Sequence, residues 1–263
     1  MTYWVEILSN KQVNKICYYI ELYAPDAVQK AAPGQFFHVQ VREGLSPLLR
    51  RPISIHYIDR EKGTLGFLYQ VKGEGTVILS KRIAGEKVSI LGPLGKGFKP
   101  DFSGEKAFLI GGGIGIAPLF PLAKELRNAQ KSVTVLIGAR TKDMVLCEEK
   151  FLSIGCNVAV STDDGTYGHA GYVSALFQQY IKSGPVDFAY LCGPEFMMAE
   201  VEKICRRNFI SGQVSIEARM GCGIGACLCC SHEKEEDQAG KYVKVCVDGP
   251  VFDLGEVKLH AAG

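Results

Sequence analysis

The pattern of apolar and polar positions along the chain changes character near residue 105. Before that point, short apolar runs alternate with turns rich in glycine and proline, a pattern that predicts β-strands. The expected strands are Tyr3–Leu8, Ile16–Leu22, Phe36–Val41, Pro52–Ile58, Thr64–Val71 and Val88–Leu91. One helix, Thr76–Ile83, is expected among them. Many short strands in succession are typical of a small antiparallel β-barrel.

After that point, apolar strands alternate with segments of helical periodicity. The expected strands are Ala107–Ile110, Val133–Ile137, Val158–Val160, Phe188–Cys192 and Val214–Ile216. The expected helices are Glu195–Phe209 and a segment whose apolar face contains Leu119, Leu122, Ala123 and Leu126. Strands that alternate with helices predict a parallel α/β sheet.

The length and composition suit two domains and a smaller appendage. The chain has 263 residues, of which 47% are apolar, so each domain can bury a core of its own. We therefore predict a barrel over 1–100, an α/β domain over 101–217 and a cysteine-rich region over 218–263. The charged stretch 233–238 within the last region predicts a solvated loop.

The charge and the N-terminal sequence argue against several classes of protein. A formal net charge of +2 without a basic cluster offers no footprint for nucleic acid or for a membrane surface. The N-terminal sequence MTYWVEILSN lacks the features of a signal peptide. No apolar run approaches the roughly 18 residues that a transmembrane helix needs. We therefore expect a cytoplasmic protein.

Half of the ten cysteines lie close together near the C-terminus. Four of them follow the pattern Cys222-x4-Cys227-x2-Cys230, followed by Cys246 after fifteen intervening residues. This is the ligand spacing of plant-type [2Fe–2S] ferredoxins, in which three thiolates converge on two irons from one tight loop. The glycines between these cysteines supply the backbone freedom that such a loop requires.

A structural zinc site is the alternative interpretation of these cysteines. Zinc prefers paired C-x2-4-C knuckles, and Cys246 has no nearby cysteine to pair with. Cys229 lies between two of the expected ligands and could compete for a ligand position. A small buried side chain that points away from the cluster is the favoured interpretation of Cys229.

Two loops that connect a strand to a helix are candidates for binding a dinucleotide. The first contains Gly111, Gly112, Gly113 and Gly115, and the second contains Cys192, Gly193 and Pro194. Free backbone N–H groups at a helix start suit a pyrophosphate, and both loops are expected at the carboxyl ends of their strands. The first loop does not match the G-x-G-x-x-G fingerprint, so a plain tight turn stays an alternative. The Cys192 thiol is expected either beside a nicotinamide ring or in the core.

Two motifs in the barrel are candidates for holding a phosphate. The first is Arg51-Pro52-Ile53-Ser54, where an arginine lies near a hydroxyl group. The second is Gly75-Thr76 at the start of the expected helix, where backbone and hydroxyl donors are available. Each motif alone is weak, but their order along the chain, with the glycine turn beyond them, is much more specific.

In this order, the motifs RPIS, GEGT, GGGIGIAPL and LCGP resemble those of the ferredoxin–NADP reductase superfamily. The tail, with MGCGIGACLCC and VCVDGPVF, resembles more narrowly the electron-transfer subunits of dihydroorotate dehydrogenase B. The resemblance covers essentially the whole chain. It implies a [2Fe–2S] cluster on Cys222, Cys227, Cys230 and Cys246, and NAD as the electron acceptor. It also implies FAD bound by Arg51, Pro52, Ile53, Ser54, Leu68, Tyr69, Gln70, Gly75 and Thr76.

The resemblance further implies a partner, an FMN-containing catalytic subunit that oxidises dihydroorotate to orotate in pyrimidine synthesis. Two copies of each chain would form a heterotetramer, and the catalytic base would lie on the partner, so no catalytic residue is expected here. Gln70 and Cys229 depart from the family, where arginine and alanine are common at these positions.

Three alternatives stay open at the level of sequence. The flavoprotein subunits of bifurcating ferredoxin–NADP reductase and of sulfhydrogenases share the FAD and nicotinamide parts, but their cluster loops differ from C-x4-C-x2-C. The third is a non-enzymatic zinc module attached to a degenerate reductase fold. A shared fold alone does not decide between these functions.

Overall fold

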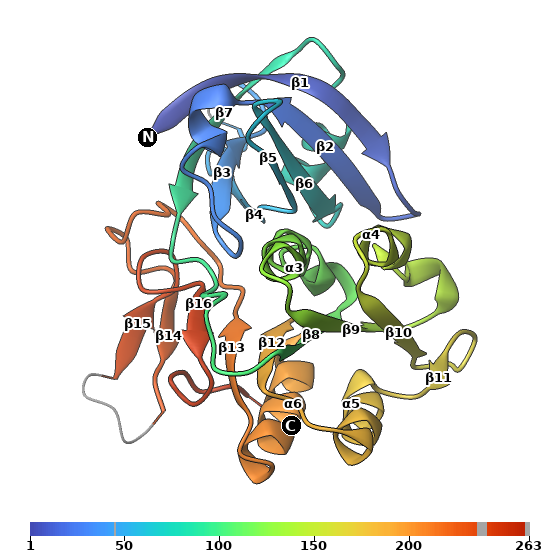
Figure 1. Cartoon of the computed structure of the whole chain (residues 1–263). Helices are drawn as coiled ribbons and strands as arrows, with labels where there is room; N and C mark the ends of the chain where they lie inside the picture. Colours follow the sequence, from blue (N-terminus) through green and yellow to red (C-terminus); the bar gives the residue numbers. More distant parts are fainter. Residues whose placement is uncertain (45, 236–240, 261–263) are drawn as a thin grey trace.

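The structure, a computed structural model, describes residues 1–44, 46–235 and 241–260. Its secondary structure is arranged in two seven-stranded sheets and one two-stranded sheet. Figure 1 shows the first sheet curled at one end of the molecule and the second sheet, with its helices, at the other. The predicted succession of an antiparallel barrel and a parallel α/β sheet is confirmed.

The N-terminal sheet is an antiparallel half-barrel with the strand order β4-β3-β7-β1-β2-β6-β5. Its strands are β1 (Thr2–Gln12), β2 (Cys17–Tyr23), β3 (Phe36–Gln40), β4 (Arg51–Ser54), β5 (Tyr57–Asp59), β6 (Thr64–Gln70) and β7 (Lys87–Leu94). Its helices are α1 (Pro25–Val28), which was not predicted, and α2 (Glu74–Ser80). The helix predicted over Thr76–Ile83 begins earlier, because the Thr76 hydroxyl accepts a hydrogen bond from the N–H of Gly73 and caps the first turn.

The strand predicted over Pro52–Ile58 is divided into β4 and β5 in the structure. β4 pairs with β3, whereas β5 pairs with β6 in an antiparallel hairpin. Between them the Ile55 N–H donates to Gln35 and the His56 N–H donates to Gly66, so the chain changes partner strand at this point. The division carries the chain from one edge of the half-barrel to the other.

The second sheet has the strand order β11-β10-β9-β8-β12-β13-β16. Its strands are β8 (Lys106–Gly112), β9 (Ser132–Ala139), β10 (Asn157–Thr162), β11 (His169–Ala170), β12 (Phe188–Cys192), β13 (Ser211–Ser215) and β16 (Val251–Asp253). Its helices are α3 (Leu119–Asn128), α4 (Glu148–Ser153), α5 (Val173–Ser183) and α6 (Glu195–Arg207). Two short 3-10 helices, η1 (Gly113–Ile116) and η2 (Lys142–Met144), complete this part. The elements α4, α5, β11 and β16 were not predicted.

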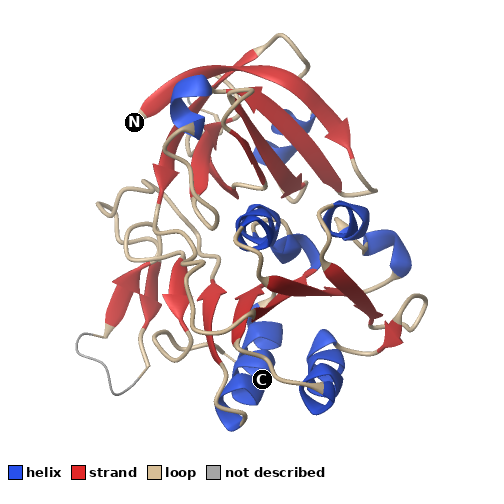
Figure 2. Cartoon of the chain, viewed as in Figure 1, coloured by secondary structure: helices blue, strands red, loops and turns tan. Residues whose placement is uncertain are grey.

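Helices cover both faces of the second sheet. Figure 2 shows α3 and α4 on the face toward the half-barrel, and α5 and α6 on the opposite face. The apolar residues of α3 and α4 share one core with barrel residues such as Leu68, while those of α5 and α6 form a second core with Val245 and Cys246. The sheet therefore packs against the barrel on one side and against the cysteine-rich region on the other.

The C-terminal region is joined to the second sheet by a strand. β16 pairs antiparallel with β13 through Val214 and Phe252, while β14 (Ser231–Glu233) and β15 (Tyr242–Lys244) form a separate hairpin. Residues 236–238 of the predicted charged loop lie outside the described residues. No helix in the described part of the chain is long and apolar enough to cross a membrane.

A buried histidine joins the half-barrel to the α/β domain. His56, which is fully buried, donates a hydrogen bond from Nδ1 to the Ala117 carbonyl, 2.9 Å away. Its Nε2 accepts from the Lys150 ammonium at 3.1 Å, and that ammonium lies 4.5 Å from the Tyr19 ring centroid. Burial, and then the charge of Lys150, lower the pKa of His56 from 6.5 to about 4, so the imidazole is neutral at pH 7.

We expect this histidine to make the protein less stable in mild acid. Between pH 6.5 and about 4 the unfolded chain binds a proton at His56 that the folded chain does not, so the free energy of unfolding decreases as the pH falls. The loss between pH 7 and pH 5 is on the order of 2 kcal/mol from this residue alone. Denaturant titrations of the holoprotein at both pH values measure it.

The matched variant is His56→Gln, whose side chain can donate a hydrogen bond to Ala117 but does not titrate. This variant should lose measurably less stability than the wild type between pH 7 and pH 5. An equal loss in both proteins would contradict the assignment of this pH dependence to His56.

Candidate functional site

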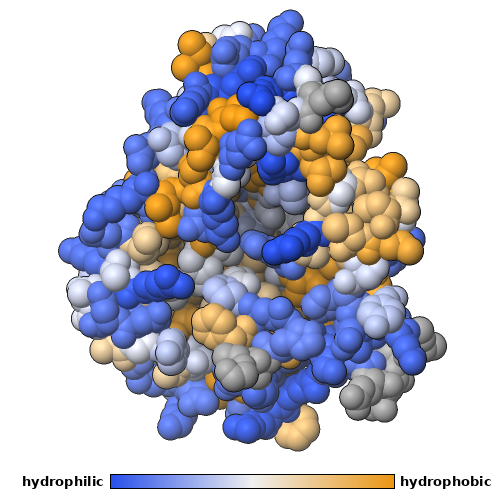
Figure 3. Space-filling model, turned by 180° about the vertical axis from the view of Figure 1, so that it is seen from behind, coloured by the Kyte–Doolittle hydropathy of each residue, from blue (hydrophilic) through white to orange (hydrophobic). Residues whose placement is uncertain are grey.

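A cavity at the junction of the domains brings together eight of the nine predicted FAD residues. From the half-barrel, it is lined by Phe36, Arg51, Pro52, Ile53, Ser54, Leu68, Tyr69, Gln70, Lys72 and Thr76. The empty space is about 1000 Å³, counting the part that is open to solvent. Figure 3 shows the surface hollowed between the half-barrel and the α/β domain. A cavity of this size and mixed lining suits a large cofactor.

Arg51 lies directly over the ninth predicted residue, Gly75. A β-carbon at Gly75 would lie 2.6 Å from the Cζ of Arg51, so any other residue here would displace the guanidinium from the first turn of α2. Arg51 also donates a hydrogen bond to the Leu49 carbonyl. The geometry therefore places a cation and the N–H groups of a helix start at one end of the cavity, as a phosphate would require.

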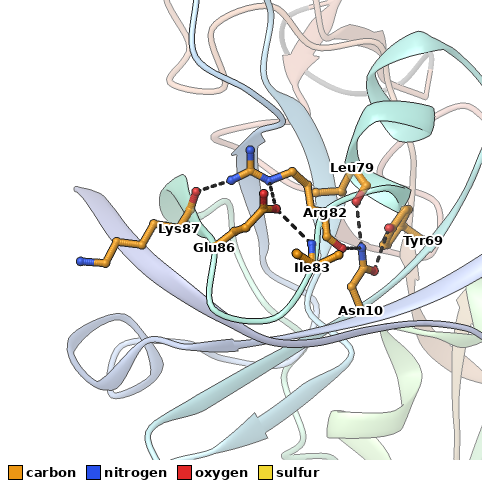
Figure 4. A network of polar contacts seen from close by, with 7 residues as sticks. All are labelled: Asn10, Tyr69, Leu79, Arg82, Ile83, Glu86 and Lys87. Atoms are coloured by element: carbon orange, nitrogen blue, oxygen red, sulfur yellow. Dashed lines mark hydrogen bonds and ion pairs between the residues drawn. The ribbon is translucent and has the colours of Figure 1, made fainter.

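The aromatic wall of the cavity is held by a network of polar contacts (Figure 4). Tyr69, on β6, donates from its hydroxyl to Asn10 Oδ1 at 3.0 Å. The Asn10 amide in turn donates to the carbonyls of Leu79 and Arg82, at 2.8 and 2.9 Å, at the end of α2. Because β1, β6 and α2 share these bonds, the orientation of the Tyr69 ring is coupled to the helix that begins beside Arg51.

The other wall comes from segments that the sequence did not single out as flavin contacts. These residues are Ile114, Ala117, Pro118, Ile216, Glu217, Ala218, Met220 and Pro250. Three belong to the end of the glycine turn, and four belong to the segment between β13 and the cysteine loop. The sequence feature that could have identified 216–220 as part of the site was its position directly before Cys222. The same short segment thus borders the cavity and leads into the cluster loop.

The two predicted nucleotide loops lie side by side at the carboxyl ends of neighbouring strands. Gly111 on β8 pairs with Cys192 on β12. β8 therefore lies between β12 on one side and β9, the next strand along the chain, on the other. A β-carbon at Gly115 would lie 2.5 Å from the Gly193 Cα, so the loops touch backbone to backbone. This is the switch point of the sheet, where open α/β folds bind their ligands.

Cys192 and Pro194 take different places in this arrangement. The Cys192 side chain is buried, and burial raises the pKa of its thiol, which excludes an ionised thiolate at neutral pH. Pro194 packs beside Gly112, where a β-carbon would lie 2.7 Å from the proline Cδ. Gly113, half-buried at the start of η1, has a φ of +54°, and a β-carbon there would meet no atom within 4 Å. Contacts of these residues with a nicotinamide dinucleotide stay predictions.

Three backbone N–H groups converge on the sulfur of Cys222. The donors are Ile224, Ala226 and Cys227, at 3.5, 3.3 and 3.4 Å from Sγ. Hydrogen bonds from Ile224 and Cys227 lower the pKa of the Cys222 thiol from 9.0 to about 6. Such a nest of N–H groups stabilises a thiolate, the form in which cysteine binds iron.

The four predicted ligands form two pairs. The Cys222 N–H donates to Cys227 Sγ at 3.4 Å, and Cys246 is hydrogen-bonded to Cys230. Burial raises the pKa of Cys246 to about 12. Among the residues that the structure describes, no three Cys, His, Asp or Glu side chains are grouped as ligands of a single metal ion. The sequence spacing of these cysteines, rather than their pairing, favours a [2Fe–2S] cluster over zinc.

Cys229 is exposed, so the interpretation as a small buried side chain is wrong. Leu228 adopts a left-handed conformation with φ of 59°, and the turn that it makes buries Cys230 while it directs Cys229 outward. Cys229 lines a second hollow together with Leu48, Leu49 and Met220.

Two parts of the chain match described families. Residues 109–203 match the oxidoreductase NAD-binding domain. Residues 217–258 match the iron-sulfur cluster binding domain of dihydroorotate dehydrogenase B. The first range contains both nucleotide loops, and the second contains all four paired cysteines.

Solved structures place the whole arrangement among reductases. The structure of the NADH-dependent reduced ferredoxin–NADP oxidoreductase has a TM-score of 0.87 and 28% identity, with 97% of this chain and 90% of that chain covered. A ferredoxin–NADP+ reductase from Neisseria gonorrhoeae has a TM-score of 0.68 at 16% identity, covering 78% and 91%, and shares the fold. The fold and the site therefore define a flavin- and nicotinamide-dependent reductase of the ferredoxin–NADP reductase type.

Curated relatives narrow this class. Dihydroorotate dehydrogenase B (NAD(+)) electron transfer subunits from Desulforamulus reducens and Bacillus cereus strain Q1 are 42% and 43% identical to this chain. The alignments cover 96% of this chain in both cases, and 96% and 97% of the relatives. The chain belongs to the family of dihydroorotate dehydrogenase B electron transfer subunits, and it is a component of an oxidoreductase with a separate catalytic subunit.

Proposed function

We propose that this chain carries electrons between an FMN-containing dihydroorotate dehydrogenase subunit and NAD+, in a heterotetramer with two copies of each chain. The observation that carries the proposal is the segment 216–220, which borders the flavin cavity and leads directly into the paired cysteines. The two cofactor sites are therefore adjacent, as transfer between them requires. The reducing conditions of the cytoplasm would suit the thiolate ligands.

The residues of the flavin cavity fit FAD. Arg51 and the start of α2 would bind the phosphates, and the strand Leu68–Gln70 would lie along the ring system. Gln70 gives this strand a neutral amide where the family commonly has a cation. The apolar walls from Phe36 and Met220 would exclude water from the flavin.

The cysteine region fits a [2Fe–2S] cluster, with Cys222 and Cys227 holding one iron and Cys230 and Cys246 holding the other. When bound, the cluster would supply one-electron chemistry and FAD the two-electron chemistry that NAD+ requires. The side-by-side glycine loops would bind the pyrophosphate of NAD. None of these tasks needs a side chain of this chain to act as a general acid or base.

The partner would dock on the face that surrounds the cluster loop. Ile224 and Leu228 on this loop are 60% and 62% exposed, and Leu48 is 71% exposed beside the second hollow. Figure 3 shows apolar side chains gathered on this side of the molecule, between the half-barrel and the cysteine region. An exposed apolar patch beside a cluster site suits a subunit that must exchange electrons with it.

A role in flavin-based bifurcation is the second candidate, because the NADH-dependent reduced ferredoxin–NADP oxidoreductase shares the fold over almost the whole chain. Its identity of 28% is well below the 42–43% of the dihydroorotate dehydrogenase subunits. The plant-type cysteine spacing also favours the dihydroorotate function. The domain limits 1–100, 101–217 and 218–263 are part of the proposal.

The test is dihydroorotate-dependent NADH formation by the complex isolated from native cells on a tag attached to this chain. Formation of NADH, together with a co-purified FMN protein in equal amount, is the expected result. A preparation that contains FAD and iron and oxidises NADH, but forms none from dihydroorotate, would contradict the dihydroorotate function and favour the second candidate.

A further inference from the structure

His38 lies between the flavin cavity and the cluster loop, although nothing in its sequence context marks it. It belongs to β3, which lies next to the edge strand β4 of the half-barrel, and only 1% of its surface is exposed. Its ring is 5.7 Å from the ring of Phe36, which lines the cavity. On the other side it meets Gly223, the residue that follows the ligand Cys222.

The contact with Gly223 is close. A β-carbon at Gly223 would lie 2.9 Å from both Cε1 and Nε2 of His38 and 3.1 Å from Leu94 Cδ1. Gly223 also has a φ of +73°, which other residues rarely adopt. Glycine at this position therefore lets the cluster loop lie directly against the imidazole edge that carries Nε2.

His38 Nε2 has no hydrogen-bond partner among the residues that the structure describes, although it is buried. A buried polar atom without a hydrogen bond costs free energy, so we expect His38 Nε2 to have a hydrogen-bond partner. Burial, and then the charge of Arg50, lower the pKa of His38 to about 4, so the imidazole is neutral and one ring nitrogen carries a proton. Arg50 is itself fixed by Ser89, whose carbonyl and hydroxyl lie 2.9 Å from the guanidinium.

We infer that His38 is a positioning residue for the cluster, and that its Nε2–H donates a hydrogen bond to a sulfur of the cluster when the cluster is bound. The inference rests on the proposed cluster site. A bound cluster would bring inorganic sulfide, a further sulfur acceptor, beside this loop, where Nε2 has no partner among the described residues. Hydrogen bonds to cluster sulfurs raise the reduction potential, so His38 sets the driving force at the flavin side of the cluster.

The experiment compares His38→Leu, which removes the donor, with His38→Gln, whose amide nitrogen can replace Nε2–H. The midpoint potential and the EPR spectrum of the reduced cluster are measured in the purified complex, with iron content as a check on loading. His38→Leu should lower the potential and shift the g values, and His38→Gln should largely restore both. His232→Gln is the matched control, because His232 Nε2 is already bonded to the Lys258 carbonyl, 2.9 Å away.

A second measurement detects the hydrogen bond in the wild-type protein and uses His38→Gln only to assign the signal. In wild-type protein labelled with 15N-histidine, pulsed EPR of the reduced cluster should show a weak nitrogen coupling that His38→Gln removes. A cluster signal without histidine coupling, or an unchanged potential in His38→Leu, would show that His38 only packs against the loop. A wild-type complex without any [2Fe–2S] signal would overturn the cluster proposal itself, and this inference with it.

Discussion

Replacement of Cys227 by serine is expected to abolish NAD+ reduction by dihydroorotate while NADH-dependent dye reduction continues. Cys227 is paired with Cys222 at the exposed edge of the loop, and a hydroxyl is a poor ligand for iron. Loss of a supporting residue around a metal ligand already costs 10–100-fold, so loss of a ligand should cost more than about 100-fold. The flavin cavity and the nucleotide loops are formed by other residues and should keep their function.

The matched control is Cys229→Ser, two residues further along the same loop. Its side chain is exposed and is not paired with the four predicted ligands, so iron content and both activities should stay close to wild type. Iron, FAD and the two activities are measured on the same preparations of the complex. Full iron content and full dihydroorotate activity in Cys227→Ser would show that Cys227 is not a ligand.

Replacement of Gly115 by alanine is expected to separate the two nucleotide loops and to impair the reaction with NADH. The added methyl group would lie 2.5 Å from the Gly193 Cα and 2.6 Å from the Cys192 carbonyl oxygen, and backbone atoms cannot rotate away as a side chain can. Overpacking of this kind costs about 1–3 kcal/mol of stability. A displacement of the loops by about 1 Å would reduce NADH oxidation about 100-fold.

Gly184→Ala is the control for this substitution. Gly184 has an extended backbone, and a β-carbon there would meet no atom within 4 Å. Steady-state NADH–dye kinetics and thermal unfolding are compared for both variants, together with the cluster spectrum. The spectrum should be unchanged in Gly115→Ala, because the cysteine loop is elsewhere. NADH oxidation at the wild-type rate would contradict the close packing of the two loops.

Several features of the fold could be predicted from local patterns, and others could not. The prediction of β12 agrees with the structure residue by residue, because a buried parallel strand is a continuous apolar run. Helix α5 was missed, although Val173, Leu176 and Phe177 have helical spacing, because the stretch before it contains a two-residue strand and several turns. The single strand expected over Pro52–Ile58 was wrong, because periodicity does not show where a strand changes its partner.

The sequence by itself determined the family and the order of the domains, and it predicted the four cysteines of the cluster. Each of these depends on the spacing of residues within short motifs. A loop of a few residues fixes this spacing, because it must bring its binding residues to one ligand. The tertiary structure decided which residues form the second wall of the cavity, how the cysteines pair, and that His38 faces Gly223. These contacts join segments up to about two hundred residues apart in sequence. They depend on strand order and on the packing of β3 against the cluster loop, and no local pattern encodes either of them.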